Sequence, residues 1–207
     1  AFKAPFLFAE WRHVVDAWQL ATWDAYRDVA RLGRRTRLPE AQRALLWAIF
    51  DRVHAELASL GRITQAELYT ALAAQIASSE QVVFDFSVVD EAQDVSVAQL
   101  RFPAALGGDR PNALFFAGDL GQRIFQQPFS WLSLGVDIRG RSRTLRVNYR
   151  TSHQIRSQAD RLLGPEVTDA DGNAEIRGDT VSVFNGPPPT VTVLSSENAE
   201  IQAVADW

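Results

Sequence analysis

The sequence contains no cysteine, no methionine and a single lysine, Lys3. Without cysteine, the chain has neither a disulfide framework nor a thiolate metal site. No apolar run is long enough to cross a bilayer, and the first residues show no signal-peptide pattern. We therefore expect a soluble protein that does not act at a membrane, and a cytoplasmic location fits these absences.

Hydrophobic residues make up 46% of the 207 residues, which excludes a disordered chain. The formal net charge of −4 gives no general reason to expect nucleic-acid binding. The positive charge is almost all arginine, however, and the planar guanidinium group suits phosphate. The arginines cluster at Arg31, Arg34, Arg35 and Arg37, and again at Arg139, Arg141, Arg143, Arg146 and Arg150. Arginine-rich solvated surfaces explain each cluster equally well.

Residues 1–80 have the periodicity of helices. Apolar residues recur at helical spacing at Trp11, Val14, Val15 and Trp18. A second apolar stripe runs from Leu46 to Leu60 and ends at Gly61, and Thr64 with Glu67 forms a capping box for a further helix. We expect an all-helical subdomain here, with its tryptophans packed in the core.

After residue 80 the pattern changes to strands that alternate with helices. Strands are expected at 82–89, 112–117, 144–147, 180–184 and 190–194. Helices are expected at 97–106, 155–163 and 197–207, the last with Ser196 as its N-cap. Residues 169–173 read as a polar loop. Alternation of this kind predicts an α/β core with a parallel sheet.

An acidic pair, Asp90 and Glu91, directly follows the first expected strand. In open α/β sheets, ligands bind just beyond the carboxyl ends of the strands. An aspartate there can hold Mg²⁺, directly or through water, and a neighbouring glutamate can deprotonate an attacking water. For the pair taken alone, an ordinary acidic loop is the better explanation.

Three longer strings change this balance. They are Val88–Asp94 with the sequence VVDEAQD, Gly118–Phe125 with GDLGQRIF, and Leu145–Ser152 with LRVNYRTS. In this order they resemble motif II (Walker B), motif III and motif IV of the UvrD/Rep-type superfamily I DNA helicases. The helical block also resembles the subdomain inserted in these helicases, through Trp18–Arg27, Arg31–Arg37 and Leu38–Trp47.

The resemblance implies an α/β fold built on the parallel sheet of a RecA-like P-loop NTPase. Residues 1–80 would be the helical insertion, 81–143 the C-terminal half of a first RecA-like domain, and 144–207 the start of a second. The phosphate-binding pattern Gly-x-x-x-x-Gly-Lys-Ser/Thr is absent from the sequence. In the family it lies upstream of the insertion, so we expect a central fragment that hydrolyses ATP poorly or not at all by itself.

The resemblance also implies roles around bound ATP. Asp90 would coordinate the Mg²⁺ of the nucleotide, and Glu91 would be the catalytic base. Gln122 would sense the γ-phosphate, and Arg150 would reach it as a finger-like positive charge, which suits the charge of a phosphoryl-transfer transition state.

Other residues would connect this ATP site to DNA. Gln93 and Asp94 would bridge toward motif III, and Asp119 would position the motif III loop. Phe125 matches the aromatic residue of motif III, and such residues stack on the bases of single strands.

Further DNA contacts are less specific in the sequence. The family often has a tryptophan two positions after Phe125, where this chain has Gln127. Trp131 could replace it, although core packing is the better explanation for Trp131 alone. Arg35 and Arg37 could contact DNA phosphates, which would add affinity without sequence choice.

The function implied is that of an ATP-dependent helicase that moves on single-stranded DNA, with 3′ to 5′ polarity. Its ligands would be ATP and Mg²⁺, and its partners single-stranded DNA and duplex junctions. Two alternatives stay open: a non-catalytic module that binds DNA or protein, and the motor part of a helicase–nuclease. The presence of both Asp90 and Glu91 argues against the non-catalytic module.

Overall fold

A computed structural model describes residues 2–34, 36–79, 82–123, 127–163, 166–176 and 179–207. The chain forms two compact units, Ala1–Ser142 with Thr168–Ala174, and Arg143–Val167 with Glu175–Trp207. The ranges 1–80 and 81–143, expected as two domains, thus lie within one compact unit. The chain first enters the second unit at Arg143, beside the expected boundary between 143 and 144.

The first part of this unit is helical. Its elements are α1 (Ala4–Glu10), a π-helical turn (Trp11–Val15), α2 (Asp16–Trp18), α3 (Trp23–Asp28), α4 (Glu40–Ser59) and α5 (Gln65–Ala77). Gly61 has a φ of 60°, the left-handed conformation of a glycine that ends a helix. The Thr64 hydroxyl accepts the Glu67 N–H at 3.1 Å and caps α5, as the sequence predicted. Within the described ranges, no helix is both long and apolar enough to span a bilayer.

A short parallel sheet follows. Strand β1 (Ser87–Val89) pairs with β2 (Leu114–Phe116), with Val89 opposite Phe116. The strand expected over 82–89 is therefore wrong in its first five residues. In the part of the chain that the structure describes, only β2 pairs with β1, so residues 82–86 have no strand beside them and stay exposed. The side chain of Arg110 donates to the carbonyls of Phe84 and Asp85 at 2.9 Å each, but this contact does not make a strand.

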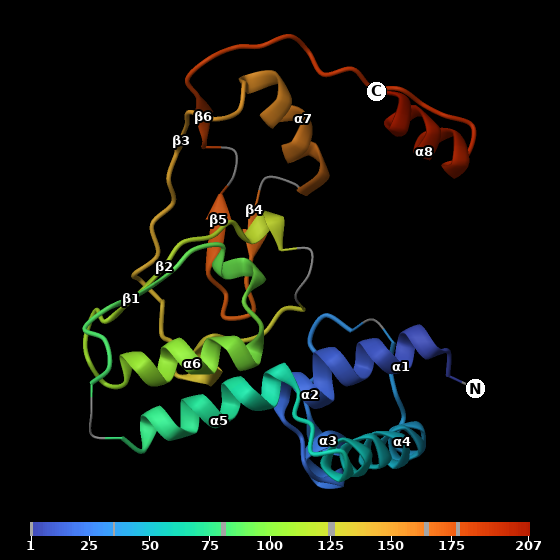
Figure 1. The fold of residues 1–207 in the computed structure, drawn as a ribbon. Coiled ribbons are helices and arrows are strands. Elements are labelled where there is room, and N and C mark those ends of the chain that lie inside the picture. The colour runs from blue at the N-terminus through green and yellow to red at the C-terminus, as the bar shows by residue number, and fades with distance from the viewer. Residues whose placement is uncertain (1, 35, 80–81, 124–126, 164–165, 177–178) are drawn as a thin grey trace. The chain divides into compact units, whose positions relative to one another are not determined.

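Helix α6 (Val97–Gly107) covers one side of this strand pair. The Ser96 hydroxyl accepts the Gln99 N–H, and the Gln99 side chain accepts the Ser96 N–H, which completes a capping box. Helix α6 lies alongside α5 and contacts both strands (Figure 1). The side chains of Val88 and Phe115, in contrast, are 71% and 62% exposed, so the strand pair also presents apolar residues to solvent.

The described part of the second unit contains two helices and a second parallel strand pair. Strands β3 (Val147–Asn148) and β6 (Val181–Ser182) pair in parallel, and α7 (His153–Leu163) lies between them in sequence. Helix α8 (Glu197–Asp206) begins at the predicted cap Ser196. The strand expected at 190–194 is absent, because these described residues have no strand beside them and are exposed.

Strands β4 (Glu166–Thr168) and β5 (Ala174–Ile176) pair with each other and were not predicted. They enclose the expected polar loop at 169–173. The chain belongs to the first unit from Thr168 to Ala174 and to the second unit on both sides of that stretch.

Two apolar clusters form the core of the first unit. The helical cluster contains Val14, Val15, Tyr26, Leu38, Leu46 and Phe50, with Trp11, Trp23 and Trp47 packed against it. The sheet cluster contains Ala17, Ala92, Val97, Leu100, Phe129, Trp131 and Val136, with Trp18 packed against it. The prediction that the tryptophans of the helical block pack in the core is confirmed.

A buried carboxylate, Glu10, holds the helical cluster together. Arg31 donates to its Oε1 and Oε2 at 2.6 Å each, and Arg34 lies 3.1 Å from Oε2. The Tyr26 hydroxyl donates to Oε1 at 3.1 Å. Burial and the nearby Glu10 raise the pKa of Tyr26, so the phenol keeps its proton and continues to donate. Two arginines of the first cluster therefore neutralise a buried carboxylate instead of facing solvent.

Glu10→Gln is expected to lower the free energy of unfolding by about 3 kcal/mol, because it leaves two largely buried guanidinium groups without their counter-charge. Urea unfolding followed by circular dichroism measures this change. Glu56→Gln, on the exposed side of α4, is the matched control and should change the value by less than about 0.5 kcal/mol. Equal effects of the two substitutions would contradict a structural role for Glu10.

Candidate functional site

The pairing of β1 with β2 places two of the three motif-like strings at one edge of the sheet. The Ala117 N–H donates to the Val89 carbonyl at 2.9 Å, and the Ala92 N–H donates to the Ala117 carbonyl at 2.8 Å. These backbone hydrogen bonds continue the strand pairing beyond the ends of both strands. Asp90 and Glu91 lie in the loop between the two bonded residues Val89 and Ala92. The acidic pair and the start of the second string lie at the carboxyl ends of parallel strands, where ligands of such sheets bind.

The acidic pair occupies a sharp turn. Glu91 adopts the left-handed conformation, with φ 51° and ψ 42°, which is uncommon for a residue other than glycine. Its N–H donates to Asp90 Oδ1 at 2.9 Å, so the aspartate stabilises the turn that carries the glutamate. Both side chains are exposed. The turn therefore presents two neighbouring carboxylates to solvent.

A buried amide connects the two strings. Gln93, which is 6% exposed, donates from Nε2 to Glu91 Oε2 at 2.7 Å and accepts the Asp119 N–H at Oε1 at 3.0 Å. The Asp119 carboxylate in turn accepts the Gly121 N–H at 2.8 Å and the Gln122 Nε2–H at 2.9 Å. A continuous series of hydrogen bonds therefore runs from Glu91 to Gln122.

Gly118 allows the side chain of Gln93 to approach the backbone of the second string, because glycine has no Cβ atom. A Cβ atom at position 118 would lie 2.6 Å from Gln93 Oε1, and 3.1 and 3.2 Å from the backbone nitrogens of Ala92 and Gln93. Any side chain at this position would push the amide of Gln93 away from Asp119. The glycine of the second string is thus required by the close approach of the first string.

Asp94 has a different environment. Its N–H donates to the Glu91 carbonyl at 2.9 Å, and its side chain lines a cavity of about 250 Å³. Its Oδ1 atom is buried and has no hydrogen-bond partner among the described residues. The contact between the two strings is thus made by Gln93, and Asp94 connects the first string to this cavity.

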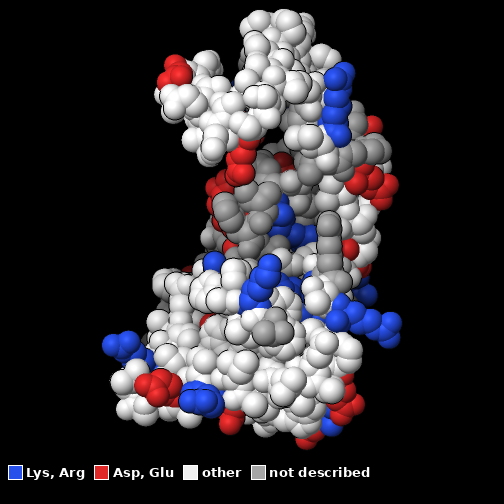
Figure 2. All heavy atoms as spheres, turned by 90° about the vertical axis from the view of Figure 1, so that its right-hand side faces the viewer, with Lys and Arg blue, Asp and Glu red and all other residues white. Residues whose placement is uncertain are grey.

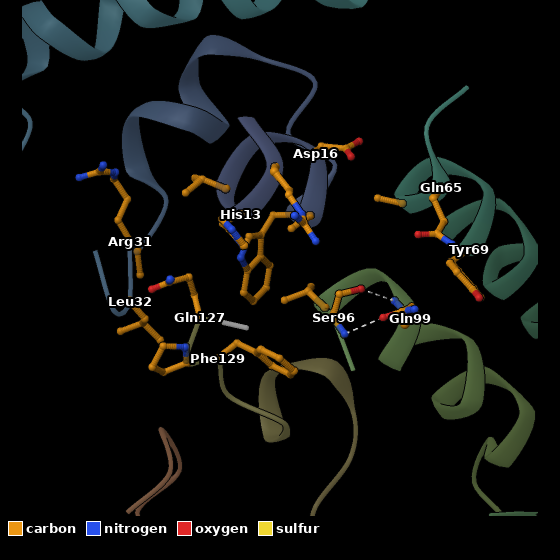
Figure 3. A pocket seen from close by; sticks show the side chains of 18 of the residues that line it. His13, Asp16, Arg31, Leu32, Gln65, Tyr69, Ser96, Gln99, Gln127 and Phe129 are labelled. Atoms are coloured by element: carbon orange, nitrogen blue, oxygen red, sulfur yellow. Dashed lines mark hydrogen bonds between the residues drawn. The ribbon is translucent and has the colours of Figure 1, made fainter. Parts of the chain in front are cut away.

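The cavity lies between the π-helical turn, α5, the start of α6 and residues 127–129 (Figure 3). Figure 3 shows aromatic and hydrogen-bonding side chains around it, among them His13, Gln65, Tyr69, Gln127 and Phe129. Burial, with Arg12 and Arg34 nearby, lowers the pKa of His13, so the imidazole is neutral at pH 7. Sequence reasoning missed this cavity because its walls come from segments far apart in the chain.

The residues expected to contact DNA differ in their exposure to solvent. Trp131 is 7% exposed and packs edge-on against Phe116, with ring centroids 4.9 Å apart, which favours core packing over a stacking platform. Arg37 is exposed. Phe125 and Arg35 lie outside the described residues. Basic side chains lie in separate groups on the face drawn in Figure 2, with uncharged and acidic surface between them.

Arg150 belongs to the second unit. Asn148 Oδ1 accepts the backbone N–H groups of Arg150 and Thr151 at 2.9 and 3.0 Å and so fixes the turn that follows β3. The side chain of Arg150 is exposed, as is that of Tyr149. This turn is a stable base from which a guanidinium group reaches into solvent.

In the described ranges, no group of three or more His, Asp or Glu side chains could hold a metal ion. Mg²⁺ at nucleotide sites, however, takes one or two protein carboxylates and fills its other positions with phosphate and water. The exposed carboxylate of Asp90, at the end of β1, fits that limited role. The chain matches no known family model and no curated protein sequence, so the functional interpretation depends on the three strings and on this geometry.

Gly118→Ala is expected to lower the free energy of unfolding by about 1–3 kcal/mol, because the new methyl group overlaps with Gln93 Oε1. The same substitution in a Gln93→Ala background should be less harmful by about 1 kcal/mol, since the overlapping oxygen is gone. Denaturant unfolding of the four proteins of this double-mutant cycle measures the difference. An equal loss of unfolding free energy in the two backgrounds would show that there is no steric overlap between the methyl group introduced at position 118 and Gln93.

Proposed function

We propose that this chain belongs to an ATP-dependent DNA helicase of the UvrD/Rep type and carries its motifs II, III and IV. The observation that carries the proposal is the hydrogen-bond series from Glu91 through Gln93 and Asp119 to Gln122. It joins the residue proposed as catalytic base to the residue proposed as γ-phosphate sensor. A chance acidic loop would have no need of such a connection.

The strand pair supports a RecA-like sheet for residues 81–143. Its two strands are parallel, and parallel sheets are usually covered on both faces and consist of more than two strands. Val88 and Phe115 are exposed, as apolar residues on one face of a larger sheet would be if the segments that cover this face were absent. We propose that 144–207 starts a second domain of the same kind and that 1–80 is the helical insertion.

In this proposal, Asp90 would hold Mg²⁺ when ATP is bound, with the phosphates supplying further ligands. The bound ion would neutralise charge on the β- and γ-phosphates. Glu91 takes the proton of the attacking water. Because its Oε2 is held by Gln93 at 2.7 Å, the orientation of the carboxylate is set before substrate binds, and Oε1 takes the proton.

Gln122 is then the residue that reports the state of the nucleotide. Its Nε2 donates one of its two hydrogens to Asp119 Oδ2 at 2.9 Å, which leaves the second hydrogen and the carbonyl oxygen for the nucleotide and the attacking water. Donation of this second hydrogen to a γ-phosphate oxygen would connect the nucleotide to Asp119 through one amide. ATP binding would therefore bias the position of the Asp119–Gln122 loop, which continues in sequence toward Phe125, the proposed stacking residue for single-stranded DNA.

Arg150 supplies the remaining positive charge in this proposal. Its turn is fixed by Asn148, and its exposed guanidinium group is free to approach a phosphoryl group in the transition state. Arg35 and Arg37 are proposed phosphate contacts on DNA. The 3′ to 5′ polarity rests on the resemblance alone.

Glu91→Gln is expected to lower ATP hydrolysis by about 10²- to 10⁴-fold, because it removes the proposed base while keeping the size of the side chain. The measurement is the hydrolysis rate, with and without a single-stranded oligonucleotide, of the protein encoded by the complete reading frame. Glu56→Gln should keep the full rate. The 207-residue chain, whose sequence lacks the phosphate-binding loop, should hydrolyse ATP at background rate.

Two results would contradict the proposal. One is a rate that Glu91→Gln leaves unchanged. The other is a clear rate from the 207-residue chain that Glu91→Gln abolishes, because hydrolysis would then need no phosphate-binding loop of the expected kind.

A further inference from the structure

Asp171, in the loop between β4 and β5, accepts three hydrogen bonds from the segment that follows the motif III string. Its Oδ1 accepts the hydroxyl of Ser130, and its Oδ2 accepts the backbone N–H groups of Trp131 and Leu132 at 2.7 and 3.1 Å. The donors stand at the start of the 3-10 turn Leu132–Leu134. Hydrogen bonds to a charged acceptor are about twice as strong as neutral ones, so this carboxylate holds the turn firmly.

The loop that carries Asp171 is itself well held. Asp169, which is 8% exposed, accepts the N–H of Asp171 at 2.9 Å, and the N–H and Nδ2–H of Asn173 at 2.8 Å each. The Asp169 N–H donates to the Asn173 carbonyl at 3.0 Å. One aspartate thus shapes the loop, and the other is presented to the Ser130–Leu132 turn.

That turn places Trp131 against the sheet. The indole packs at 90° to the ring of Phe116, with centroids 4.9 Å apart, and stacks on Phe129 at 6.2 Å. Phe116 is the last residue of β2, and the chain reaches Asp119 within three residues. A direct path of contacts therefore runs from Asp171 through Trp131 and Phe116 to the loop that carries Asp119.

We propose that Asp171 is a positioning residue for the Asp119–Gln122 loop and acts through Trp131. Its importance for catalysis rests on the proposed function of that loop, but the contacts do not. The chain on both sides of 168–174 belongs to the second unit, which also contains Arg150. The placement of the motif III string would thus depend on a segment that comes after the motif IV string in the chain.

Amide hydrogen exchange tests this directly. In Asp171→Ala, exchange at Trp131 and Leu132 should be about tenfold or more faster, because both amides lose a charged acceptor. A positioning role adds a second effect, which is several-fold faster exchange at Asp119 and Gly121. These are the amides bonded to Gln93 and to the Asp119 carboxylate.

The control variants separate positioning from general loss of stability. Asp171→Asn keeps an oxygen that can accept both backbone N–H groups but loses the charge, so exchange at Trp131 and Leu132 should speed up less than in Asp171→Ala. Exchange at Asp119 and Gly121 should then stay close to that of the original chain. Asp109→Ala, an exposed aspartate beyond α6, should leave all four unchanged. If Asp171→Ala does not fold, Ser130→Ala removes the hydroxyl that donates to Asp171 and accepts the Ser133 N–H, and it should give the same pattern with about threefold changes.

The proposal is overturned if, in Asp171→Ala or Ser130→Ala, exchange speeds up at Trp131 and Leu132 while Asp119 and Gly121 stay unchanged, because the role is then local. Equal acceleration within α5 would also overturn it, since that indicates global destabilisation. No nucleotide or DNA enters this experiment. It can therefore fail while Glu91→Gln abolishes hydrolysis, or succeed while Glu91→Gln has no effect, and the two proposals are judged separately.

Discussion

The side-chain amide of Gln93 is the constraint on which the geometry of the candidate site depends. Pairing of β1 with β2 brings the ends of two strands together, but each strand then continues into a loop that pairing alone does not fix. Gln93 uses both ends of its amide, one on Glu91 and one on the backbone of Asp119. Because the amide is buried, either bond left unmade would cost about 1–3 kcal/mol, so the two loops keep one arrangement.

The acidic residues of this chain include both a buried group and an exposed group. Glu10 is buried and satisfied by Arg31, Arg34 and Tyr26, whereas Asp90 and Glu91 are exposed. A buried carboxylate with full partners cannot lose one of them without destabilising the fold, and it is closed to ligands. An exposed pair at the end of a parallel strand is open to a metal ion and to phosphate. Burial therefore separates two groups of acids that look alike in the sequence.

The local signals of the sequence predicted much of the secondary structure. The caps at Thr64 and Ser196 and the terminating Gly61 appear where they were expected, because each depends on a few neighbouring residues. The strands were predicted less well. Residues 82–86 and 190–194 have strand-like composition, but a strand needs a hydrogen-bonding neighbour that composition does not supply. The pairing of β4 with β5 was missed for the opposite reason, since its short strands carry little apolar pattern.

The sequence by itself determined the order of the three strings and the identity of Asp90, Glu91, Gln122 and Arg150 as candidate residues, because a motif is a matter of residue type and spacing. Only the tertiary structure decided which of them are connected. Of Gln93 and Asp94, which the resemblance implied together as the bridge, it connected Gln93 to both Glu91 and Asp119. It packed Trp131 in the core, the better of the two explanations that the sequence left open, and it brought Asp171 to a turn forty residues away in the chain. These contacts join segments that are far apart in the chain, and no local sequence pattern predicts which distant segments will meet. The contacts therefore become visible only in the folded structure.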